Sequence, residues 1–590
     1  MNRRDYLRLC GGAAASTFAD HAAGLSIKTA PGHVVAASGA APGVELSRDW
    51  KGDTCRAVVT NRGKQPVAIT EVVLFAIAHS LPAETILYGE SFQMLSQTAG
   101  TLGAPMDLGY NELNHYKLAQ PEGVTVATGL LTLTPPGADT ILLGYTSCKR
   151  FNGRFYLRPE TVEAVLDTEG LLLEPGEWWE LEELIVLSGR NRAELLSTLA
   201  DRIVRNQPSL QRKSPPTGWC SWYCFGPRVT AKNVIDNLDV IAKNVPSLRY
   251  IQIDDGYQPA MGDWLETGKA FGGDIKTVLQ EIHRRNFEPA IWVAPFIAEE
   301  KSHLFQEHPE WFIQSAAGNP LASHLVTFGG WRHGPWYALD GTNPYVQKHL
   351  TSVFRTMRND WGCTYFKLDA NFWGAMHGGR FHDRRATRIE AYRRGMRAIL
   401  NGAGDSFILG CNHPIWPSFG LIHGSRSSAD IKRTWDVIQK VARQNLNRNW
   451  QDGRLWWNDP DAVVLTGTLP ENEFVFHATA VYASGGMILS GDDLTTMSSD
   501  RLAILRKLLP PTGIAATFQD ESLRVGTVQL KDQRMICLFN WKDEFQTITA
   551  ALPRRCRITD YWNDRDLGGF DQAFTATAMP PHSARLLSCR

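Results

Sequence analysis

Three polar side chains, Lys367, Asp369 and Asn371, close an apolar and aromatic run in the middle of the chain. The run from Cys363 to Phe366 is typical of a buried strand, and side chains two residues apart in a strand share a face. The three polar groups are therefore expected to project together. A cation beside a carboxylate keeps the carboxylate ionised, as a nucleophile requires. The pattern is typical both of a nucleophilic Asp369 and of an ion pair at a strand end.

A second carboxylate, Asp430, follows the segment Ser425-Arg426-Ser427-Ser428-Ala429. Cleavage of a glycosidic bond uses two carboxyl groups, one on each side of the bond. Asp430 is the candidate proton donor to the leaving oxygen, and Arg426 is placed to orient substrate hydroxyls. Such an acid needs a raised pKa before the nucleophile attacks and a lowered pKa afterwards. The alternative for Asp430 is an N-cap for a helix that begins near residue 431.

Four further residues have the chemistry of a sugar-binding wall: Asp254, Asp255, Trp222 and Trp292. Carboxylates bind paired hydroxyls through charge-assisted hydrogen bonds, and flat indole rings suit the faces of a pyranose ring. The alternatives are capping of the following loop for the two aspartates and packing in a core for each tryptophan.

The elements that would position these residues are short apolar strands alternating with amphipathic helices. Thr230, for example, is a candidate cap for a helix with Val234, Ile235, Leu238 and Ile241 on one face. Eight such strand and helix units predict an α/β fold, a (β/α)8 TIM barrel. The expected strands are 219–223, 250–254, 289–294, 364–369, 407–411, 422–426, 455–458 and 486–490.

Polar residues fall at or just after the carboxyl ends of these strands. Barrel active sites are assembled at that end, because the strand bodies fill the core and the following loops are free to carry chemistry. The sequence therefore predicts one site built from residues on every strand, which are Trp222, Asp254, Asp255, Trp292, Lys367, Asp369, Cys411, Asn412, Arg426, Asn458, Asp459, Asp492 and Asp493.

The rest of the 590-residue chain is too long for one hydrophobic core, which indicates several domains. Alternating strands and turns predict an N-terminal β-sandwich with a linking helix over 41–213, followed by the catalytic barrel over 214–512. Alternation returns in a small antiparallel β-domain over 513–590. The aromatic segment 296–343 either roofs the site or is a packed insertion.

Residues 1–40 read as a twin-arginine-type signal and linker. Arg3 and Arg4 precede a mildly apolar, Gly/Ala-rich stretch that reaches about Ala19, too short and too weak for a membrane span. The sequence therefore predicts export to the periplasm or the extracellular space. The alternative is a basic tail on a cytoplasmic protein. Arg8 argues against a lipid anchor on Cys10.

Composition excludes several classes of partner. Lys+Arg and Asp+Glu balance at 61 each, so the chain has no basic field for nucleic acid or an anionic membrane. The ten cysteines and sixteen histidines show no metal-ligand spacing, and no Gly-rich phosphate loop follows a strand. We expect no metal and no cofactor.

A set of short segments carries a family resemblance. In chain order they are GWCSWY at 218–223, IDDGYQ at 253–258, IWVAPF at 291–296, HPEW at 308–311, KLDAN at 367–371, GCN at 410–412, RSSAD at 426–430, WNDPD at 457–461 and GDDL at 491–494. Together they resemble the α-galactosidases (melibiases) of glycoside hydrolase family 36, across the whole middle domain. The flanking β-domains also match the layout of that family.

The resemblance implies a retaining α-galactosidase in which Asp369 is the nucleophile and Asp430 the acid/base. It also implies substrate-binding roles: the galactose 4- and 6-hydroxyls on Asp254 and Asp255, the 3- and 4-hydroxyl side on Lys367, the 2-hydroxyl near Cys411 and Arg426, and the ring between Trp222 and Trp292. Asn371 is expected to face the sugar beside the nucleophile.

Three alternatives stay open at this stage. An α-N-acetylgalactosaminidase would need room at the 2-position near Cys411, and a galactosyltransferase of the raffinose type would pass the sugar to an acceptor. The third is a non-catalytic carbohydrate-binding barrel, against which the intact Asp369 and Asp430 argue. The expected substrate is an α-galactoside in an oligosaccharide, a polysaccharide side chain or a glycoconjugate.

Overall fold

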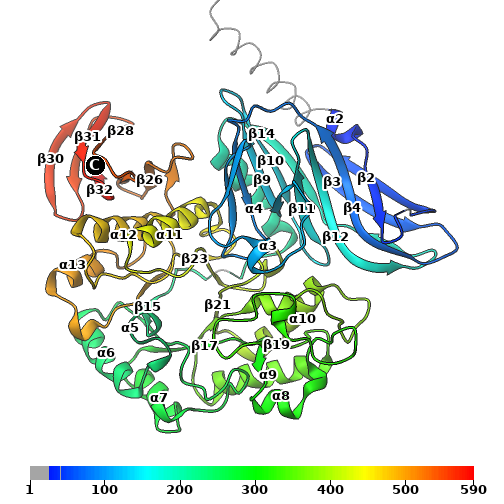
Figure 1. Ribbon diagram of the computed structural model, residues 1–590. Helices are drawn as coiled ribbons and strands as arrows, with labels where there is room; N and C mark the ends of the chain where they lie inside the picture. The colour runs from blue at the N-terminus through cyan, green and yellow to red at the C-terminus, as the bar shows by residue number, and fades with distance from the viewer. Residues whose placement is uncertain (1–24, 40, 211) are drawn as a thin grey trace, which may run out of the picture.

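The structure is a computed structural model that describes residues 25–39, 41–210 and 212–590. Figure 1 shows three parts in chain order: a β-domain in blue and cyan, a barrel in green and yellow, and a C-terminal β-domain in orange and red. The predicted signal at residues 3–19, with Cys10, lies outside the described residues. Among the residues that are described, no helix is both long enough and apolar enough to cross a membrane.

Eight parallel strands form the central sheet, in the order β23-β22-β21-β20-β17-β16-β15-β24. The backbone N–H of Met487 donates to the carbonyl of Asn458 at 2.8 Å, which joins the two outer strands and nearly closes the barrel. The predicted (β/α)8 barrel is confirmed, with a strand at each of the eight predicted places. The strands are β15 (Thr217–Cys220), β16 (Tyr250–Ile253), β17 (Glu288–Val293), β20 (Tyr365–Leu368), β21 (Phe407–Gly410), β22 (Gly424–Arg426), β23 (Trp457–Asp459) and β24 (Ile488–Ser490).

Amphipathic helices surround this sheet. In α6 the predicted cap Thr230 forms a reciprocal capping box with Asn233, and Val234, Leu238 and Ile241 are buried against the barrel. The barrel helices are α6 (Ala231–Asn244), α7 (Lys276–Arg284), α9 (Pro344–Asn359), α10 (Arg388–Ala403), α11 (Trp435–Asn447), α12 (Glu471–Ser484) and α13 (Ser499–Lys507).

Two strands end earlier than the sequence predicts. Strand β15 ends at Cys220, and Trp222 instead begins the short helix α5 (Trp222–Phe225). Strand β20 ends at Leu368, because Ala370 adopts a left-handed conformation with φ 52° and ψ 26° that turns the chain into the 3-10 helix η5 (Asn371–Ala375). The predicted alternation therefore fails at Asn371, which does not continue the strand face of Lys367.

Two antiparallel sheets form the N-terminal β-domain, as predicted, in the orders β1-β4-β12-β11-β8 and β13-β3-β14-β10-β9-β5-β6-β7, with β2 paired to β3. The first sheet begins before residue 41: β1 lies inside the segment predicted as signal and linker, and it pairs with β4. That boundary was wrong because four residues of that segment complete the sheet edge. The strands are β1 (His33–Ala36), β2 (Val44–Lys51), β3 (Thr54–Asn61), β4 (Val67–Ala78), β5 (Ile86–Glu90), β6 (Gln97–Thr101), β7 (Ala104–Asp107), β8 (Thr125–Thr128), β9 (Leu130–Thr134), β10 (Thr140–Tyr145), β11 (Asn152–Leu157), β12 (Thr161–Leu173), β13 (Trp178–Glu180) and β14 (Leu184–Gly189).

Helix α4 (Arg192–Asn206) links this domain to the barrel, and the Asn191 side chain caps its first turn. At the other end of the chain, a six-stranded and a two-stranded antiparallel sheet form the predicted small β-domain. Its strands are β25 (Thr517–Phe518), β26 (Val525–Gln529), β27 (Arg534–Asn540), β28 (Gln546–Ala551), β29 (Cys556–Asp560), β30 (Arg565–Phe570), β31 (Ala573–Met579) and β32 (Ser583–Cys589).

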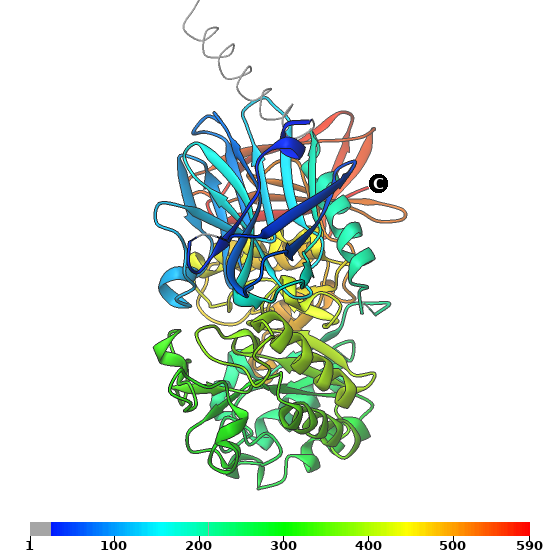
Figure 2. The ribbon, with the colours of Figure 1, turned by 90° about the vertical axis from the view of Figure 1, so that its right-hand side faces the viewer.

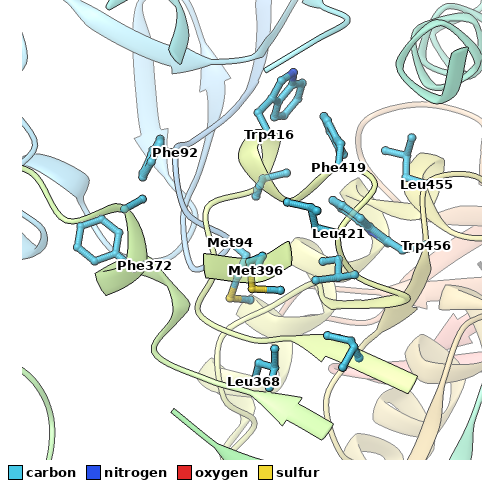
Figure 3. Packing of buried hydrophobic residues seen from close by; sticks show 14 of the residues in the cluster. Phe92, Met94, Leu368, Phe372, Met396, Trp416, Phe419, Leu421, Leu455 and Trp456 are labelled. Atoms are coloured by element: carbon cyan, nitrogen blue, oxygen red, sulfur yellow. The ribbon is translucent and has the colours of Figure 1, made fainter. Parts of the chain in front are cut away.

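The N-terminal β-domain sits directly on the barrel (Figures 1 and 2). Figure 3 shows Phe92 and Met94 from the β-domain beside Phe372, Met396 and Trp416 from the barrel, and the Phe92 and Phe372 rings meet edge to face at 6.2 Å. The two parts thus share one continuous apolar core, which fixes the β-domain against the loops that follow the barrel strands.

Candidate active site

The carboxyl ends of β16, β17, β20 and β22 bring most of the predicted residues to one rim of the barrel. Parallel pairing sets Trp292 beside Lys367 and Arg426 beside Asp459. Asp369 follows β20 directly, and its backbone N–H donates to the carbonyl of Val293 at 2.9 Å, which extends the ladder by one residue. The register therefore fixes Asp369 as rigidly as the strand itself.

Asp369 is half-buried, and both of its carboxylate oxygens are held. The Trp292 indole N–H donates to Oδ2 at 3.1 Å, and the backbone N–H of Ala370 donates to Oδ1 at 2.7 Å. Burial raises the pKa of Asp369 above its usual value, the charge of Lys367 opposes that rise, and the charge of Asp430 adds to it. A carboxylate fixed by two donors, in a site that shields it from water, has the properties of a nucleophile.

Lys367 forms an ion pair, but its partner is Asp254. The Lys367 Nζ donates to Asp254 Oδ2 at 3.0 Å, and both side chains are almost fully buried. The Gln252 amide donates to the same oxygen at 2.7 Å. Burial would lower the pKa of Lys367, but the Asp254 charge outweighs burial and raises it well above its usual value. Lys367 is therefore a fixed positive charge that also lowers the pKa of Asp369.

Asp255 is buried and bound by a residue that the sequence analysis missed. The guanidinium of Arg332 donates to both carboxylate oxygens, from Nε to Oδ2 at 3.0 Å and from Nη2 to Oδ1, and Gln258 donates to Oδ1 at 2.6 Å. Arg332 lies in the aromatic segment 296–343, of which Trp336 is buried. This segment is thus partly packed and partly a wall of the site. An arginine between two tryptophans in the sequence Trp331-Arg332-His333-Gly334-Pro335-Trp336 was the signal available.

Arg426 organises the opposite side of the rim. Its Nη2 donates to Asp430 Oδ1 at 3.0 Å and lies 3.0 Å from Asp461 Oδ2, while the Tyr223 hydroxyl donates to Asp461 Oδ2 at 2.6 Å. Burial raises the pKa of Asp461 to about 6. Tyr223 and Asp461 were missed as site residues, although both stand inside segments that carry the family resemblance.

Asp430 is not a helix cap. Helix α11 begins at Trp435 after Thr434, and the backbone N–H of Ile431 donates to Asp461 at 2.6 Å. The Asp430 side chain is 55% exposed. Burial of the surrounding site would raise its pKa, but the charges of Arg426 and Lys367 and hydrogen bonds from Arg426 and Tyr223 together lower it. The raised pKa expected of a resting acid is therefore wrong for the unliganded site, because Arg426 stabilises the carboxylate.

The loop that carries Asp430 is tied to the N-terminal β-domain. Gln444 accepts from the backbone N–H of Ala429 at 2.9 Å, and its own amide donates to the carbonyls of Leu108 at 2.8 Å and Leu95 at 3.2 Å. Arg448 donates to the carbonyl of Ser427 at 3.0 Å. The β-domain thus helps to position the second carboxylate.

Arg448 is itself anchored in the β-domain. Its Nη2 lies 2.6 Å from Glu90 Oε2 in a fully buried ion pair, and it also donates to the carbonyls of Met94 and Ser96. Neither Glu90 nor Gln444 nor Arg448 was selected from the sequence. They come from segments more than 300 residues apart, between which the sequence pattern shows no link.

The remaining predicted binding residues occupy different surroundings. Cys411 is buried with its Sγ 3.9 Å from Arg426 Nη1, and burial raises the pKa of its thiol well above the usual range. Trp222 is half-buried and packs on the apolar interior of the barrel. Asn371 is fully buried, and both polar atoms of its side chain lack a partner among the described residues.

Asp492 and Asp493, expected at the end of the last strand, have structural roles. Asp492 accepts from Arg433 at 2.6 Å and from the backbone N–H of Leu465 at 2.6 Å. Asp493 caps the 3-10 helix η8 (Leu494–Thr496) and binds Asn237 at 3.1 Å. Their polarity serves loop anchoring rather than substrate contact.

Residue types that could hold a metal come together, within the described ranges, at Asp263, Glu266 and His303. The Asp263 carboxylate already accepts the backbone N–H groups of His303 and Leu304 at the start of α8 (His303–Glu307), at 3.1 and 3.2 Å. These three residues belong to the predicted segment between β16 and β20, and they share no printed hydrogen bond with Asp369 or Asp430.

Comparison with known proteins agrees with this geometry. Residues 250–401 match the Melibiase family model. A stretch of 159 residues, 26% of this chain, is 31% identical to the A type blood alpha-D-galactosamine galactosaminidase of Flavonifractor plautii, and it spans 14% of that relative. The chain thus covers only a small part of the length of this curated relative.

Solved structures share the fold over most of the chain. The α-galactosidase of Thermus thermophilus in complex with p-nitrophenyl α-D-galactopyranoside has a TM-score of 0.65 at 21% identity, covering 84% of this chain and 98% of its own. The family 36 α-galactosidase AgaA of Geobacillus stearothermophilus has a TM-score of 0.65 at 11% identity, covering 93% of this chain and 82% of its own.

The matched stretch, 250–401, contains Asp254, Trp292, Lys367 and Asp369, the residues around the candidate nucleophile. The fold of the family 36 structures extends the likeness to the flanking β-domains. The barrel therefore carries a Melibiase domain, within a chain that has the three-part fold of the α-galactosidases of glycoside hydrolase family 36.

Proposed function

We propose that this protein is a retaining glycoside hydrolase that releases terminal α-linked galactose through a galactosyl-enzyme intermediate. The observation that carries the proposal is the placement of Asp369. It follows β20 with both oxygens held by Trp292 and Ala370, on the same barrel rim as Asp430. The Melibiase match over the Asp369 half and the fold shared with α-galactosidases support this substrate class.

In the first step, a carboxylate oxygen of Asp369 attacks the anomeric carbon as the bond to the leaving oxygen breaks. Asp430 gives its proton to that oxygen, and a β-linked galactosyl ester forms on Asp369. In the second step, Asp430 takes a proton from water, which attacks the same carbon and releases Asp369. Two displacements return the α-configuration.

The proton on Asp430 must arrive with the substrate. In the unliganded site Arg426 and Tyr223 favour its carboxylate form, and more than half of its side chain is exposed. A bound sugar would cover this exposed part and remove water from it, and burial disfavours the charged form. We infer that substrate binding raises the pKa of Asp430 and prepares it as an acid.

The other side of the rim supplies the galactose-binding groups. Asp254, fixed by Lys367, and Asp255, fixed by Arg332, present charge-assisted partners for the 4- and 6-hydroxyls. Because both carboxylates are already paired and oriented, they need little reorganisation when the sugar binds. Cys411 and Arg426 are the proposed neighbours of the 2-hydroxyl.

A second candidate activity follows from the galactosaminidase relative, whose name states a 2-amino sugar. Its site would accept a nitrogen substituent near Cys411 and Arg426. A panel of aryl α-galactoside, α-galactosaminide and α-N-acetylgalactosaminide distinguishes the two substrates. We expect the highest kcat/KM for the galactoside, and a preference for either amino sugar would overturn this choice.

Hydrolysis rather than transfer is tested in the same assay. Added raffinose or sucrose acceptors would divert the galactosyl ester to new oligosaccharides if the enzyme were a transferase. We expect free galactose as the main product with and without acceptor. NMR of the first product should show α-galactose, and β-galactose as the first product would contradict a retaining mechanism.

We also propose export from the cytoplasm. This rests on the twin-arginine-type sequence at residues 3–19 alone. Fractionation of cells that produce the full chain tests it: activity in the periplasm or medium, lost when Arg3 and Arg4 are both changed to lysine, is the expected result. Activity that stays in the cytoplasm for the unmodified chain would contradict export.

A further inference from the structure

Exposed apolar side chains are concentrated in two segments that flank the proposed active site. The first is the N-terminal-domain loop around β7 and helix α3 (Glu112–His115), with Met106, Tyr110 and Leu113. The second is the barrel insertion before β19 (Trp336–Ala338), with Leu325 and Trp331. Figure 1 shows α3 at the end of the β-domain that faces the barrel. Clustered apolar exposure of this kind marks a binding surface more often than chance.

The two segments meet through stacked rings. The Tyr110 and His115 rings stack with centroids 4.2 Å apart, and the His115 and Phe328 rings stack at 3.9 Å. The Lys117 ammonium donates to the carbonyl of His324 at 2.9 Å beside this stack. Burial lowers the pKa of His115, so its ring is uncharged at neutral pH. The result is a continuous aromatic surface made by two domains.

One end of this surface lies at the nucleophile side of the site. Phe328 contacts Trp373 at a centroid distance of 5.4 Å, and Trp331 contacts the same ring at 5.9 Å. Trp373 belongs to η5, the turn that directly follows Asp369. Trp331 also precedes Arg332, which binds Asp255.

The other end lies at the acid/base side. Tyr110 is in the loop whose Leu108 carbonyl accepts from Gln444, the residue that holds Ala429 beside Asp430. The charge of Asp430, after burial, raises the pKa of Tyr110, which shows that the two groups interact. Tyr116, next to His115, donates to Asn412 at 3.0 Å, beside Cys411.

A purely structural clamp between domains would bury these rings. Instead, Tyr110 is 41% exposed and Trp331 is 42% exposed. The Lys440 ammonium lies 5.7 Å from the Tyr110 ring centroid, where it could donate to a hydroxyl of a stacked ligand. Flat rings with a polar group at the edge match a pyranose, which has an apolar face and a rim of hydroxyls.

We propose that Tyr110, His115, Phe328 and Trp331, here called the aromatic row, bind the leaving-group sugar of an α-galactosyl oligosaccharide. The inference rests on the proposed function, because Asp430 defines where the leaving group stands. It narrows that function to substrates in which galactose is attached to a further sugar. It also gives the N-terminal β-domain a direct part in substrate choice.

The test compares two substrates that differ only in the leaving group. Galactosyl-α-1,6-glucose places a sugar on the aromatic row, whereas α-galactosyl fluoride leaves as a single atom. The measured quantity is the ratio of kcat/KM for the disaccharide to kcat/KM for the fluoride. Tyr110→Ala is expected to lower this ratio about tenfold, mainly through KM, while Tyr110→Phe keeps it within about threefold because the ring remains.

Tyr345→Ala is the matched control, since Tyr345 is an exposed tyrosine at the start of α9, outside the aromatic row. It should leave the ratio unchanged. An equal loss on both substrates by Tyr110→Ala, no loss on either, or a changed oligomeric state in size-exclusion chromatography would each overturn the inference. Wild-type protein that hydrolyses the fluoride without favouring the disaccharide over methyl α-galactoside would overturn it too. Wild-type protein that hydrolyses neither substrate would instead refute the proposed function.

Discussion

The two proposed catalytic carboxylates are held in opposite ways. Asp369 is held by the barrel alone: the ladder from Val293, the indole of Trp292 and the N–H of Ala370 all come from neighbouring strands or the next residue. Asp430 stands on a loop, 55% exposed, and its loop is tied through Gln444 and Arg448 to a separate domain. The nucleophile is thus part of the fold, whereas the acid/base depends on the docking of two domains.

This contrast matches the chemistry required of each group. A nucleophile keeps one role and benefits from a fixed position. An acid/base must change protonation state twice in each turnover, and an exposed carboxylate paired with Arg426 can respond to what covers it. The Melibiase match follows the same division, since residues 250–401 include Asp369 and stop before Arg426 and Asp430.

The largest effect is expected at the barrel-held carboxylate. Asp369→Ala removes the attacking oxygen and should lower kcat on p-nitrophenyl α-galactoside by about 10⁴-fold or more. The variant should remain folded, because its neighbours are held by backbone bonds of the ladder, and circular dichroism checks this. Retention of full activity in a folded variant would refute the assignment.

Removal of the loop-held carboxylate should depend on the leaving group. Asp430→Ala should lower kcat/KM for a disaccharide by about 10²–10⁴-fold, the range for loss of a general acid. For α-galactosyl fluoride, which leaves without a proton, the loss should be much smaller in the first step. An equal loss on both substrates would show that Asp430 does not act as the acid.

The domain contact can be broken at its buried ion pair. Arg448→Met leaves Glu90 buried and unpaired, and such a change costs about 3–5 kcal/mol in the free energy of unfolding. Thermal or urea unfolding measures this. A double variant, Arg448→Met with Glu90→Leu, should recover much of the loss because no charge remains unpaired. A single variant as stable as wild type would show that the pair contributes nothing.

A smaller, positional effect is expected from Gln444→Ala. It removes the bond to Ala429 and both bonds to the β-domain, and should lower kcat/KM about tenfold for the disaccharide and less for the fluoride. Gln439→Ala is the matched control, since Gln439 lies on the same helix but donates to Trp541 in the C-terminal domain. Equal effects of the two variants would indicate general weakening of α11 instead.

The smallest effect concerns pH. Because burial raises the pKa of Asp369, the acidic limb of kcat/KM should lie above that of an ordinary aspartate: activity falls as pH falls and Asp369 becomes protonated. Trp292→Phe removes one donor to the carboxylate and should move this limb to higher pH. Trp264→Phe, which changes a ring packed on Trp292 at 5.8 Å, should leave the limb in place. A limb that moves to lower pH in Trp292→Phe would contradict the role of the indole N–H.

The same contrast explains what could be predicted from the sequence. The barrel strands carry short apolar runs with polar ends, so all eight were located, and Asp369, Lys367, Asp254 and Trp292 were brought together as expected. Asn371 was misplaced because a left-handed Ala370 interrupts the alternation, and nothing in an alanine signals that conformation.

Residues that act through tertiary contacts were out of reach. Arg332 reaches Asp255 from an insertion 77 positions along the chain, and Gln444 and Arg448 meet the β-domain across more than 300 residues. Periodicity describes one segment at a time and cannot pair such segments. Strand β1 was assigned to a linker for the same reason, since its pairing with β4 is visible only in the sheet.

The most direct test of the central claim is to trap the galactosyl ester. A 5-fluoro-α-galactosyl fluoride forms the ester but hydrolyses it slowly, so the labelled enzyme can be digested and its peptides analysed by mass spectrometry. The account predicts a single label on Asp369, in the peptide that contains Lys367-Leu368-Asp369-Ala370-Asn371. A label on Asp430, Asp459 or Asp461 would contradict it, and so would turnover by the wild type that leaves no labelled peptide.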